Sequence, residues 1–100
     1  MMTIILLYKN MKIFKFYSNS CGPCKVQGDN LKIFSSTHPE VELVEVDVEK
    51  EGNEELFDKY QIRTIPTLKV VVGDDVVKSF TGLTVNSTLE DWYKEYQTTT

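Results

Sequence analysis

The spacing of hydrophobic and polar positions changes several times along this chain, and each change marks a predicted element. Runs rich in β-branched and aromatic residues at 12–17, 41–48, 67–72 and 76–80 predict strands. Apolar residues three or four apart at 23–36, 53–60 and from 84–87 to 96 predict helices. Gly73-Asp74-Asp75 predicts a hairpin turn between the last two strands.

Each predicted helix has an apolar side, and two begin with a residue suited to cap the first turn. Asn53 can cap the second helix, and Ser87 with Glu90 three residues later fits a capping box. The apolar positions that we expect to face the core are Val26, Leu31, Ile33 and Phe34 in the first helix, Leu56, Phe57 and Tyr60 in the second, and Leu89, Trp92, Tyr93 and Tyr96 in the last.

The predicted order from about residue 12 is β-α-β-α-β-β-α, which indicates an α/β fold. Its two βα units predict parallel strands, and the hairpin adds an antiparallel edge. We therefore expect a mixed β-sheet with helices on both faces. Residues 12–97 form the predicted domain. Residues 1–11 are either an N-terminal extension or an extra edge strand at 3–8, and we expect 98–100 to fray.

Composition limits the class of protein further. A chain of 100 residues allows one domain, and 41% hydrophobic with 26% charged residues is globular composition, not that of a disordered chain or coiled coil. The longest apolar run, Ile4 to Leu7, is too short for a membrane helix or a signal peptide. Two cysteines cannot build a disulfide scaffold. We therefore expect a soluble cytoplasmic protein without a membrane partner.

The net charge of −4 is unevenly distributed. Residues 1–39 carry +4, residues 40–60 carry −7 and residues 61–100 carry −1. An acidic chain of this kind lacks the broad basic surface that nucleic acid requires, so we expect no nucleic-acid partner. We interpret the acidic stretch 40–60 as a solvated face rather than a docking site.

Cys21-Gly22-Pro23-Cys24 is the most informative stretch for chemistry. A Cys-x-x-Cys pair can be half of a zinc site, but this chain has no third cysteine, and its only histidine, His38, precedes Pro39 in a predicted loop. The pair lies between a strand and the first turn of a helix, where unpaired N–H groups and the helix dipole stabilise a thiolate. This position favours a redox pair over a metal site or two unrelated thiols.

Position on the predicted helix also separates the roles of the two cysteines. Residues three apart on a helix are neighbours, so a Cys21–Cys24 disulfide needs little backbone strain. Cys21 at the helix end is the exposed nucleophile, and Cys24 one turn in attacks the mixed disulfide afterwards. Pro23 is tolerated there because its missing N–H would have no helical partner. We expect this redox-active disulfide and no bound cofactor.

Several segments together resemble the thioredoxin family over residues 12–96. The segments that carry the resemblance are Phe16-Tyr17, Cys21-Gly22-Pro23-Cys24-Lys25, Val46-Asp47-Val48, Ile62-Arg63-Thr64-Ile65-Pro66-Thr67 and Gly82. The resemblance implies a thioredoxin fold and a monomeric dithiol–disulfide oxidoreductase that reduces protein disulfides. It also implies that an NADPH-dependent thioredoxin reductase restores the dithiol. The helix that usually precedes the dithiol strand is missing from residues 1–10, which indicates a shortened variant.

The resemblance also implies where a substrate binds. It predicts a cis bond before Pro66, beside the dithiol, that leaves the backbone of Ile65 free to pair with an extended substrate. Gly82 belongs to the same predicted substrate surface. Ser20 stands where the family usually has tryptophan, so the surface around Cys21 is smaller and more polar than in typical members.

One departure from the family involves an exchange of charges. Thioredoxins carry a buried aspartate six positions before the first cysteine and a lysine near it, and this chain has Lys15 and Glu45 at those positions. Lys15 in mid-strand needs a partner or an exit to solvent. We predict an ion pair between Lys15 and Glu45 beneath the dithiol. The alternative is that Lys15 extends to the surface and Glu45 is solvated.

Two other functions are compatible with the same sequence. A glutaredoxin-like protein would draw electrons from glutathione, but that family typically has a different dipeptide between the cysteines and a Thr-Val-Pro segment in place of Thr64-Ile65-Pro66. A non-catalytic subunit of a larger complex could use the same fold, and the acidic stretch 40–60 is the one feature that favours it.

Overall fold

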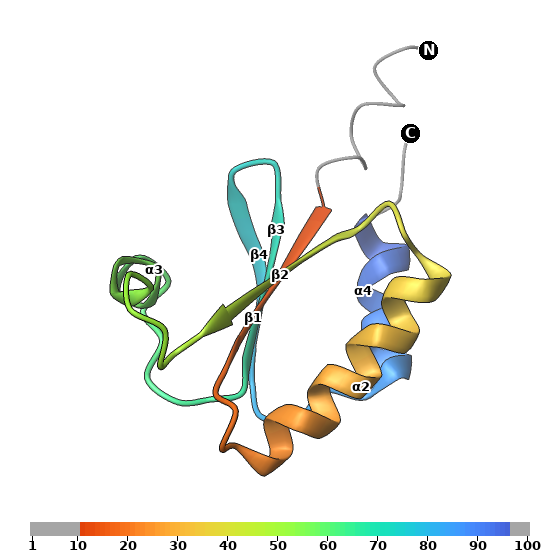
Figure 1. Ribbon diagram of the computed structural model, residues 1–100. Coiled ribbons are helices and arrows are strands. Elements are labelled where there is room, and N and C mark those ends of the chain that lie inside the picture. Colours follow the sequence, from red (N-terminus) through yellow and green to blue (C-terminus); the bar gives the residue numbers. More distant parts are fainter. Residues whose placement is uncertain (1–10, 97–100) are drawn as a thin grey trace.

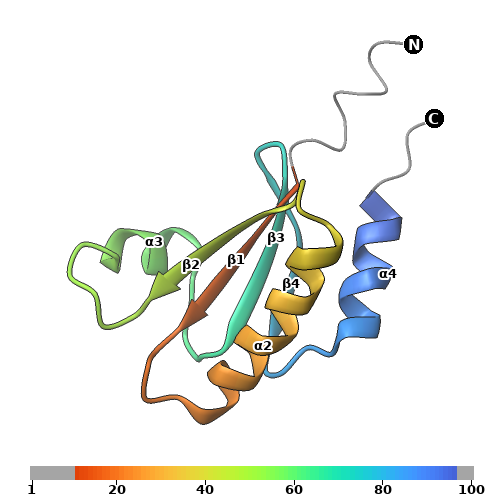
Figure 2. The same ribbon diagram turned by 45° about the vertical axis from the view of Figure 1, so that its right-hand side comes forward.

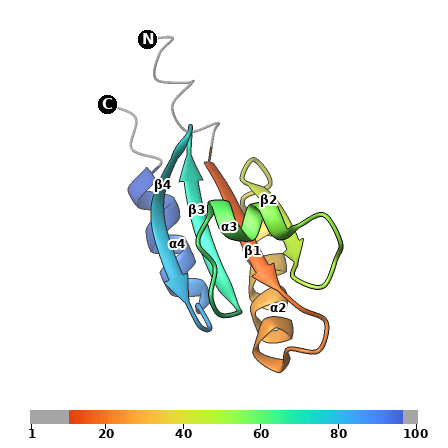
Figure 3. The ribbon, with the colours of Figure 1, turned by 90° about the vertical axis from the view of Figure 1, so that its left-hand side faces the viewer.

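A mixed four-stranded sheet forms the centre of the molecule. The structure is a computed structural model, and it describes residues 11–96. The strands lie in the order β2-β1-β3-β4, as Figure 3 shows. β1 is parallel to β2 and antiparallel to β3, and β3 is antiparallel to β4. The strands are β1 (Met11–Tyr17), β2 (Glu42–Asp47), β3 (Thr67–Val72) and β4 (Asp75–Thr81).

Three helices cover the two faces of this sheet. α2 (Gly22–Thr37) and α4 (Asn86–Tyr96) lie side by side on one face, and the short α3 (Glu54–Lys59) lies on the other (Figures 1 and 2). The predicted α/β class, the mixed sheet and the helices on both faces are confirmed. None of the helices in the described part of the chain has the length and apolar character that a membrane span requires.

The direction of β3 differs from the parallel arrangement that two βα units predict. β3 runs antiparallel to β1, so only β1 and β2 are parallel among the described strands. Asp47 at the end of β2 is opposite Tyr17, and Thr67 at the start of β3 is opposite Phe16. The connection that carries α3 therefore stays at one end of the sheet, and β3 begins at the end where β2 finishes.

The main core lies between the sheet and the pair α2 and α4. Alternate residues of β1 point into it, because successive side chains of a strand face opposite sides. The buried members are Met11, Ile13, Leu31, Phe34, Val41, Leu68, Val70 and Leu89, with Trp92, Tyr93 and Tyr96 packed against them as predicted. On the opposite face, the Phe16 ring lies 5.3 Å from that of Phe57 and 5.8 Å from that of Tyr60, measured between centroids.

The buried side of α2 differs from the predicted one. Val26 and Ile33 are 47% and 59% exposed, so their assignment to the core was wrong. The residues that face the sheet are Cys24, Gln27, Gly28, Leu31 and Phe34. Their spacing follows the helical period, and a buried glutamine and glycine interrupt its apolar character.

Asn53 is the first-turn cap position of α3 as predicted, but neither predicted cap makes its side-chain hydrogen bond. The Asn53 side chain makes no cap hydrogen bond, and its amide donates instead to the carbonyl of Asp47 at 2.9 Å. α4 begins at Asn86, one residue before the predicted cap Ser87. The carbonyl of Val85 accepts the first hydrogen bonds of α4, so Ser87 lies inside the first turn and cannot form the capping box.

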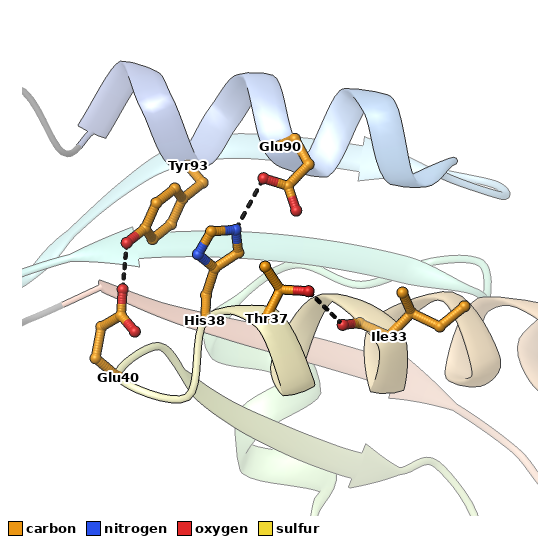
Figure 4. Close-up of polar contacts among 6 residues, drawn as sticks. All are labelled: Ile33, Thr37, His38, Glu40, Glu90 and Tyr93. Atoms are coloured by element: carbon orange, nitrogen blue, oxygen red, sulfur yellow. Dashed lines mark hydrogen bonds and ion pairs between the residues drawn. The ribbon is translucent and has the colours of Figure 1, made fainter.

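The C-terminal end of α2 is tied to α4 by the cluster in Figure 4. His38 Nε2 lies 2.8 Å from Glu90 Oε1, and the His38 ring stacks on Tyr93 with 3.6 Å between centroids. The Tyr93 hydroxyl donates a hydrogen bond to Glu40. His38 is therefore a structural contact at the end of α2 opposite to the cysteines. The predicted edge strand at 3–8 and the fraying at 98–100 lie outside the described residues.

Candidate active site

The end of β1 and the start of α2 position the two cysteines. β1 ends at Tyr17, and the tight loop that follows is closed by the Cys21 N–H, which donates to the Ser18 carbonyl at 3.3 Å. Cys21 is the N-cap of α2, with extended backbone angles of φ −93° and ψ 113°. Pro23 lies in the first turn, where its missing N–H leaves no helical bond unmade.

The two sulfurs differ in exposure, and they are joined in a disulfide. Cys24 is 1% exposed, whereas Cys21 is only partly buried. The Cys24 N–H points at the Cys21 sulfur, with 3.1 Å between nitrogen and sulfur. An N–H at a helix N-terminus stabilises negative charge on an acceptor, so the reduced Cys21 occupies a site suited to a thiolate. The geometry allows outside attack on Cys21 and shields Cys24.

Pro66 and Gly82 lie at the same end of the sheet as the cysteines. Thr67 at the start of β3 is opposite Phe16 in β1 and opposite Thr81 in β4. The loops before β3 and after β4 therefore meet the loop that carries Cys21, at the lower end of the molecule in Figure 1. The Gly82 N–H donates to the Pro66 carbonyl at 2.8 Å.

The conformation of these loops accounts for their residue types. The Ile65–Pro66 peptide bond is cis, and Gly82 has φ +110°, a region that favours glycine. Ile65 is partly exposed, and Ser20 is exposed directly before Cys21. The Ser20 hydroxyl lies 3.2 Å from the hydroxyl of the buried Ser18. The Ser20 side chain is therefore directed back toward Ser18 within the loop. The sequence-predicted substrate residues are thus brought to one end of the sheet.

Lys15 and Glu45 form the predicted ion pair. They are opposite each other in the parallel register of β1 and β2, and Lys15 Nζ lies 3.5 Å from Glu45 Oε2. The Lys15 side chain is 8% exposed, whereas that of Glu45 is 49% exposed. The alternative in which Lys15 reaches bulk solvent was wrong. Its ammonium also lies 4.2 Å from the centre of the Tyr17 ring, within reach of a cation–π contact.

This pair lies at the bottom of an open cleft of about 440 Å³ between α2 and the sheet. The cleft is lined by Lys15, Tyr17, Lys25, Gly28, Asp29, Lys32 and Glu45. Burial, together with the carboxylates of Glu45 and Asp47, raises the pKa of the Tyr17 phenol above its ordinary value. Tyr17 therefore remains a neutral hydroxyl on the wall of the cleft at physiological pH.

Gln27 is a supporting residue that the hydrophobic pattern missed. It is fully buried one turn after Cys24, where its amide Nε2 donates to the Thr84 carbonyl at 3.2 Å. The Thr84 N–H donates back to Gln27 Oε1 at 2.7 Å. This pair of bonds holds the loop after Gly82 against the cysteine helix. The signal that could have found it is position, since 24, 27, 28, 31 and 34 share one helical face.

No group of three or more His, Cys, Asp or Glu side chains within 11–96 is arranged to hold a metal ion. The sequence profile of the family described as Thioredoxin matches residues 3–95. This match covers most of the chain and contains every element of the site. The chain belongs to the thioredoxin family.

Individual thioredoxins give the degree of similarity. The mitochondrial thioredoxin of Mus musculus is 30% identical over 84 residues, which are 83% of this chain and 49% of that protein. The thioredoxin structure from Fasciola hepatica is 26% identical, with a TM-score of 0.77, and the match covers 88% of this chain and 82% of that one. A mutant thioredoxin from Halobacterium salinarum NRC-1 is 24% identical, and the match covers 89% of this thioredoxin-family chain and 76% of the other. Its TM-score of 0.80 shows that the two proteins share the fold.

The curated relatives are longer than this chain. This thioredoxin-family chain spans about half the length of the curated mitochondrial thioredoxins that it matches, 49% in the mouse protein. The similarity therefore concerns the part of each relative that corresponds to this chain.

Proposed function

We propose that this protein is a thiol–disulfide oxidoreductase that reduces disulfides in proteins. The observation that carries the proposal is the asymmetric cysteine pair at the start of α2. Cys21 is accessible and has an N–H aimed at its sulfur, and Cys24 is buried within bonding distance. Membership of the thioredoxin family supports the same activity.

In the first step, the Cys21 thiolate of the reduced protein attacks one sulfur of the substrate disulfide. A new bond joins Cys21 to that sulfur, and the substrate S–S bond breaks. The other substrate sulfur leaves as a thiolate and takes a proton from water. The Cys24 N–H and the N-terminus of α2 stabilise the attacking thiolate.

In the second step, Cys24 gives up its proton to water and attacks the Cys21 sulfur of the mixed disulfide. The Cys21–Cys24 bond forms as the bond from Cys21 to the substrate breaks, and the second substrate sulfur leaves as a thiolate that takes a proton from water. Two electrons have then passed from the dithiol to the substrate. The separation of 5.2 Å between the two Cα atoms in the oxidised protein lies within the ordinary range for a disulfide.

The surface around Cys21 supports a protein substrate. Ser20, Ile65 and Gly82 lie at one end of the sheet without a bulky side chain directly before Cys21. We propose that an extended segment of the substrate lies there and pairs with the backbone at Ile65.

We further propose that an NADPH-dependent thioredoxin reductase restores the dithiol of a monomeric, cytoplasmic protein. A reducing compartment suits a disulfide that must be opened again after each turnover. The competing donor is glutathione, and the two donors are distinguished by supplying each one separately in the same assay.

The test is reduction of insulin with NADPH and thioredoxin reductase, with glutathione and its reductase as the second arm. The wild type is expected to turn over in the first arm, and Cys21→Ser is expected to lose at least about 99% of the rate, because the attacking sulfur is missing. Cys24→Ser is the matched control. It should form a stable mixed disulfide with insulin and fail to release it.

Activity that persists in Cys21→Ser, or folded wild type inactive with both donors, would contradict the proposal. Folding of each variant is checked by circular dichroism. Turnover in the glutathione arm alone would favour the glutaredoxin-like alternative over the thioredoxin reductase partner.

A further inference from the structure

Lys15 is the one charged side chain among residues 11–96 that is buried, with 6% of its surface exposed. Lysine is rarely buried without a specific partner, because its ammonium loses hydration. Its partner Glu45 is half-exposed at 3.5 Å, so the ammonium is held on the buried side of the pair. This asymmetry leaves the positive charge closer to the interior than the negative charge.

The ammonium lies against the cysteine helix one turn from Cys24. A Cβ atom built at Gly28 would be 2.9 Å from Lys15 Nζ. Gly28 and Cys24 are four residues apart on the same buried side of α2, where such Cβ positions are about 6 Å apart. Lys15 Nζ is therefore within about 9 Å of the Cys24 Cβ.

The surrounding charges offset this ammonium only in part, because the paired Glu45 carboxylate is half-exposed. Facing the cleft from α2 are Lys25, Asp29 and Lys32, and facing it from β1 and β2 are Tyr17 and Glu45. The α2 side contributes two ammonium groups and one carboxylate, all on exposed residues. Exposed charges are screened by solvent and salt, whereas a buried charge such as Lys15 is screened much less. Lys15 is thus the weakly screened charge on the side of α2 that carries Cys24.

We infer that Lys15 is a positioning residue that tunes the redox equilibrium of the Cys21–Cys24 pair by stabilising its thiolate form. This inference rests on the proposed function, since it concerns the same dithiol. Positive charge favours the thiolate over the neutral disulfide, so it stabilises the reduced protein. A dithiol with a stabilised reduced form is a stronger oxidant and a weaker reductant.

The equilibrium with glutathione measures this effect without any protein substrate. Oxidised protein and two glutathione molecules give the dithiol and one glutathione disulfide, so two electrons and two protons move to the protein cysteines. Lys15→Met removes the charge and retains a long apolar side chain. We expect the equilibrium constant for reduction of the protein to fall about three- to tenfold, and a tenfold change corresponds to about 30 mV.

Lys12→Met is the matched control. Lys12 pairs with Glu42 across the same two strands, with Nζ 3.8 Å from Oε1, but its side chain is 44% exposed. It lies three residues before Lys15 in β1 and so faces the opposite side of the sheet. We expect the redox equilibrium of this variant to match the wild type.

The pH dependence separates a charge effect from a structural one. Below the thiol pKa values both cysteines are neutral, so wild type and Lys15→Met should have similar equilibrium constants. The difference should grow as pH rises through the free-thiol value of about 8.5. Lys15→Gln, which keeps a hydrogen-bond donor for Glu45, should behave like Lys15→Met.

Three results would overturn the inference. The first is a redox equilibrium of the neutral variants within roughly 1.5-fold of the wild type at every pH. The second is an equal change in Lys12→Met. The third is failure of both neutral variants to fold, which would make Lys15 a structural residue. An unchanged equilibrium in a protein that still reduces insulin would leave the proposed function intact.

Discussion

Gln27 occupies a position where a helix face usually carries an apolar residue, and it joins two segments of the site. It both accepts from and donates to the backbone of Thr84, the second residue after Gly82. Asn30 also donates to the Thr84 carbonyl, with 3.1 Å between nitrogen and oxygen. The loop beside the cysteines is therefore held to α2 by side-chain amides that bond the backbone of Thr84.

Replacement of Gln27 by alanine should destabilise the fold by about 2–4 kcal/mol, because it leaves the Thr84 N–H unpaired and opens a cavity. Urea unfolding of the oxidised protein measures this change. Gln27→Met keeps most of the volume and isolates the hydrogen-bond loss. Asn30→Ala should cost no more than about 1 kcal/mol, because Gln27 still donates to the same carbonyl. A loss below about 1 kcal/mol in Gln27→Ala would contradict this account.

At the scale of elements, the sequence predicted the structure best where the residue types themselves favour one backbone conformation. β3 spans the predicted 67–72 because its β-branched run suits an interior strand. The antiparallel direction of β3 could not be predicted from the alternation of elements alone, because a connection of this length can end at either end of the sheet. The pairing of Lys15 with Glu45 was predicted from the resemblance to thioredoxins, which carry a buried aspartate and a nearby lysine at these positions, and the ion pair confirms it.

The buried side of α2 shows where the pattern was insufficient. Apolar periodicity assigned Val26 and Ile33 to the core, and they are exposed. Gln27 and Gly28 take the interior positions because one binds backbone and the other leaves room for Lys15. Such roles depend on neighbours far away in sequence, so a local hydrophobic pattern carries no signal for them.

Gly28→Ala is expected to raise the free energy of unfolding by about 0.5–1 kcal/mol, because alanine is the better helix former. The new Cβ would meet Lys15 Nζ at 2.9 Å, but this atom ends a flexible side chain beside an open cleft and can move. The midpoint of urea unfolding checks the result. A loss of more than about 1 kcal/mol would show that the position of the ammonium is fixed.

At the scale of the whole molecule, α2 connects two clusters at opposite ends. Its 16 residues separate the cysteines from the cluster of His38, Glu40, Glu90 and Tyr93 by about 24 Å. The hydrogen bond from the Tyr93 hydroxyl lowers the pKa of the Glu40 carboxyl below its ordinary value of 4.5. That cluster should therefore influence stability without changing the dithiol.

Tyr93→Phe tests this separation through the pH dependence of unfolding. Because the pKa of Glu40 is lower in the folded protein, its contribution is complete above the ordinary value and is lost as pH falls through the folded value. We expect Tyr93→Phe to be less stable than wild type by under about 1 kcal/mol at about pH 6–8, with the gap closing below about pH 4.

Tyr96→Phe, the same change nearly one turn later on α4, is the control for this prediction and should not alter the pH profile. A gap between Tyr93→Phe and wild type that stays constant down to about pH 3 would show that Glu40 is not the group responsible.

The outer strand β4 carries a break in its pairing that affects self-assembly. Val70 is opposite Lys78, but Val71 is opposite Val76, so Val77 is an additional residue and packs against the core. An unbroken edge strand offers a continuous row of backbone donors and acceptors on which another chain can add. The extra residue bends this row in its middle. A strand of a neighbouring molecule can therefore pair with only part of β4 before the bulge interrupts the row of backbone groups. This interruption opposes the growth of one molecule's sheet into the next in a concentrated solution.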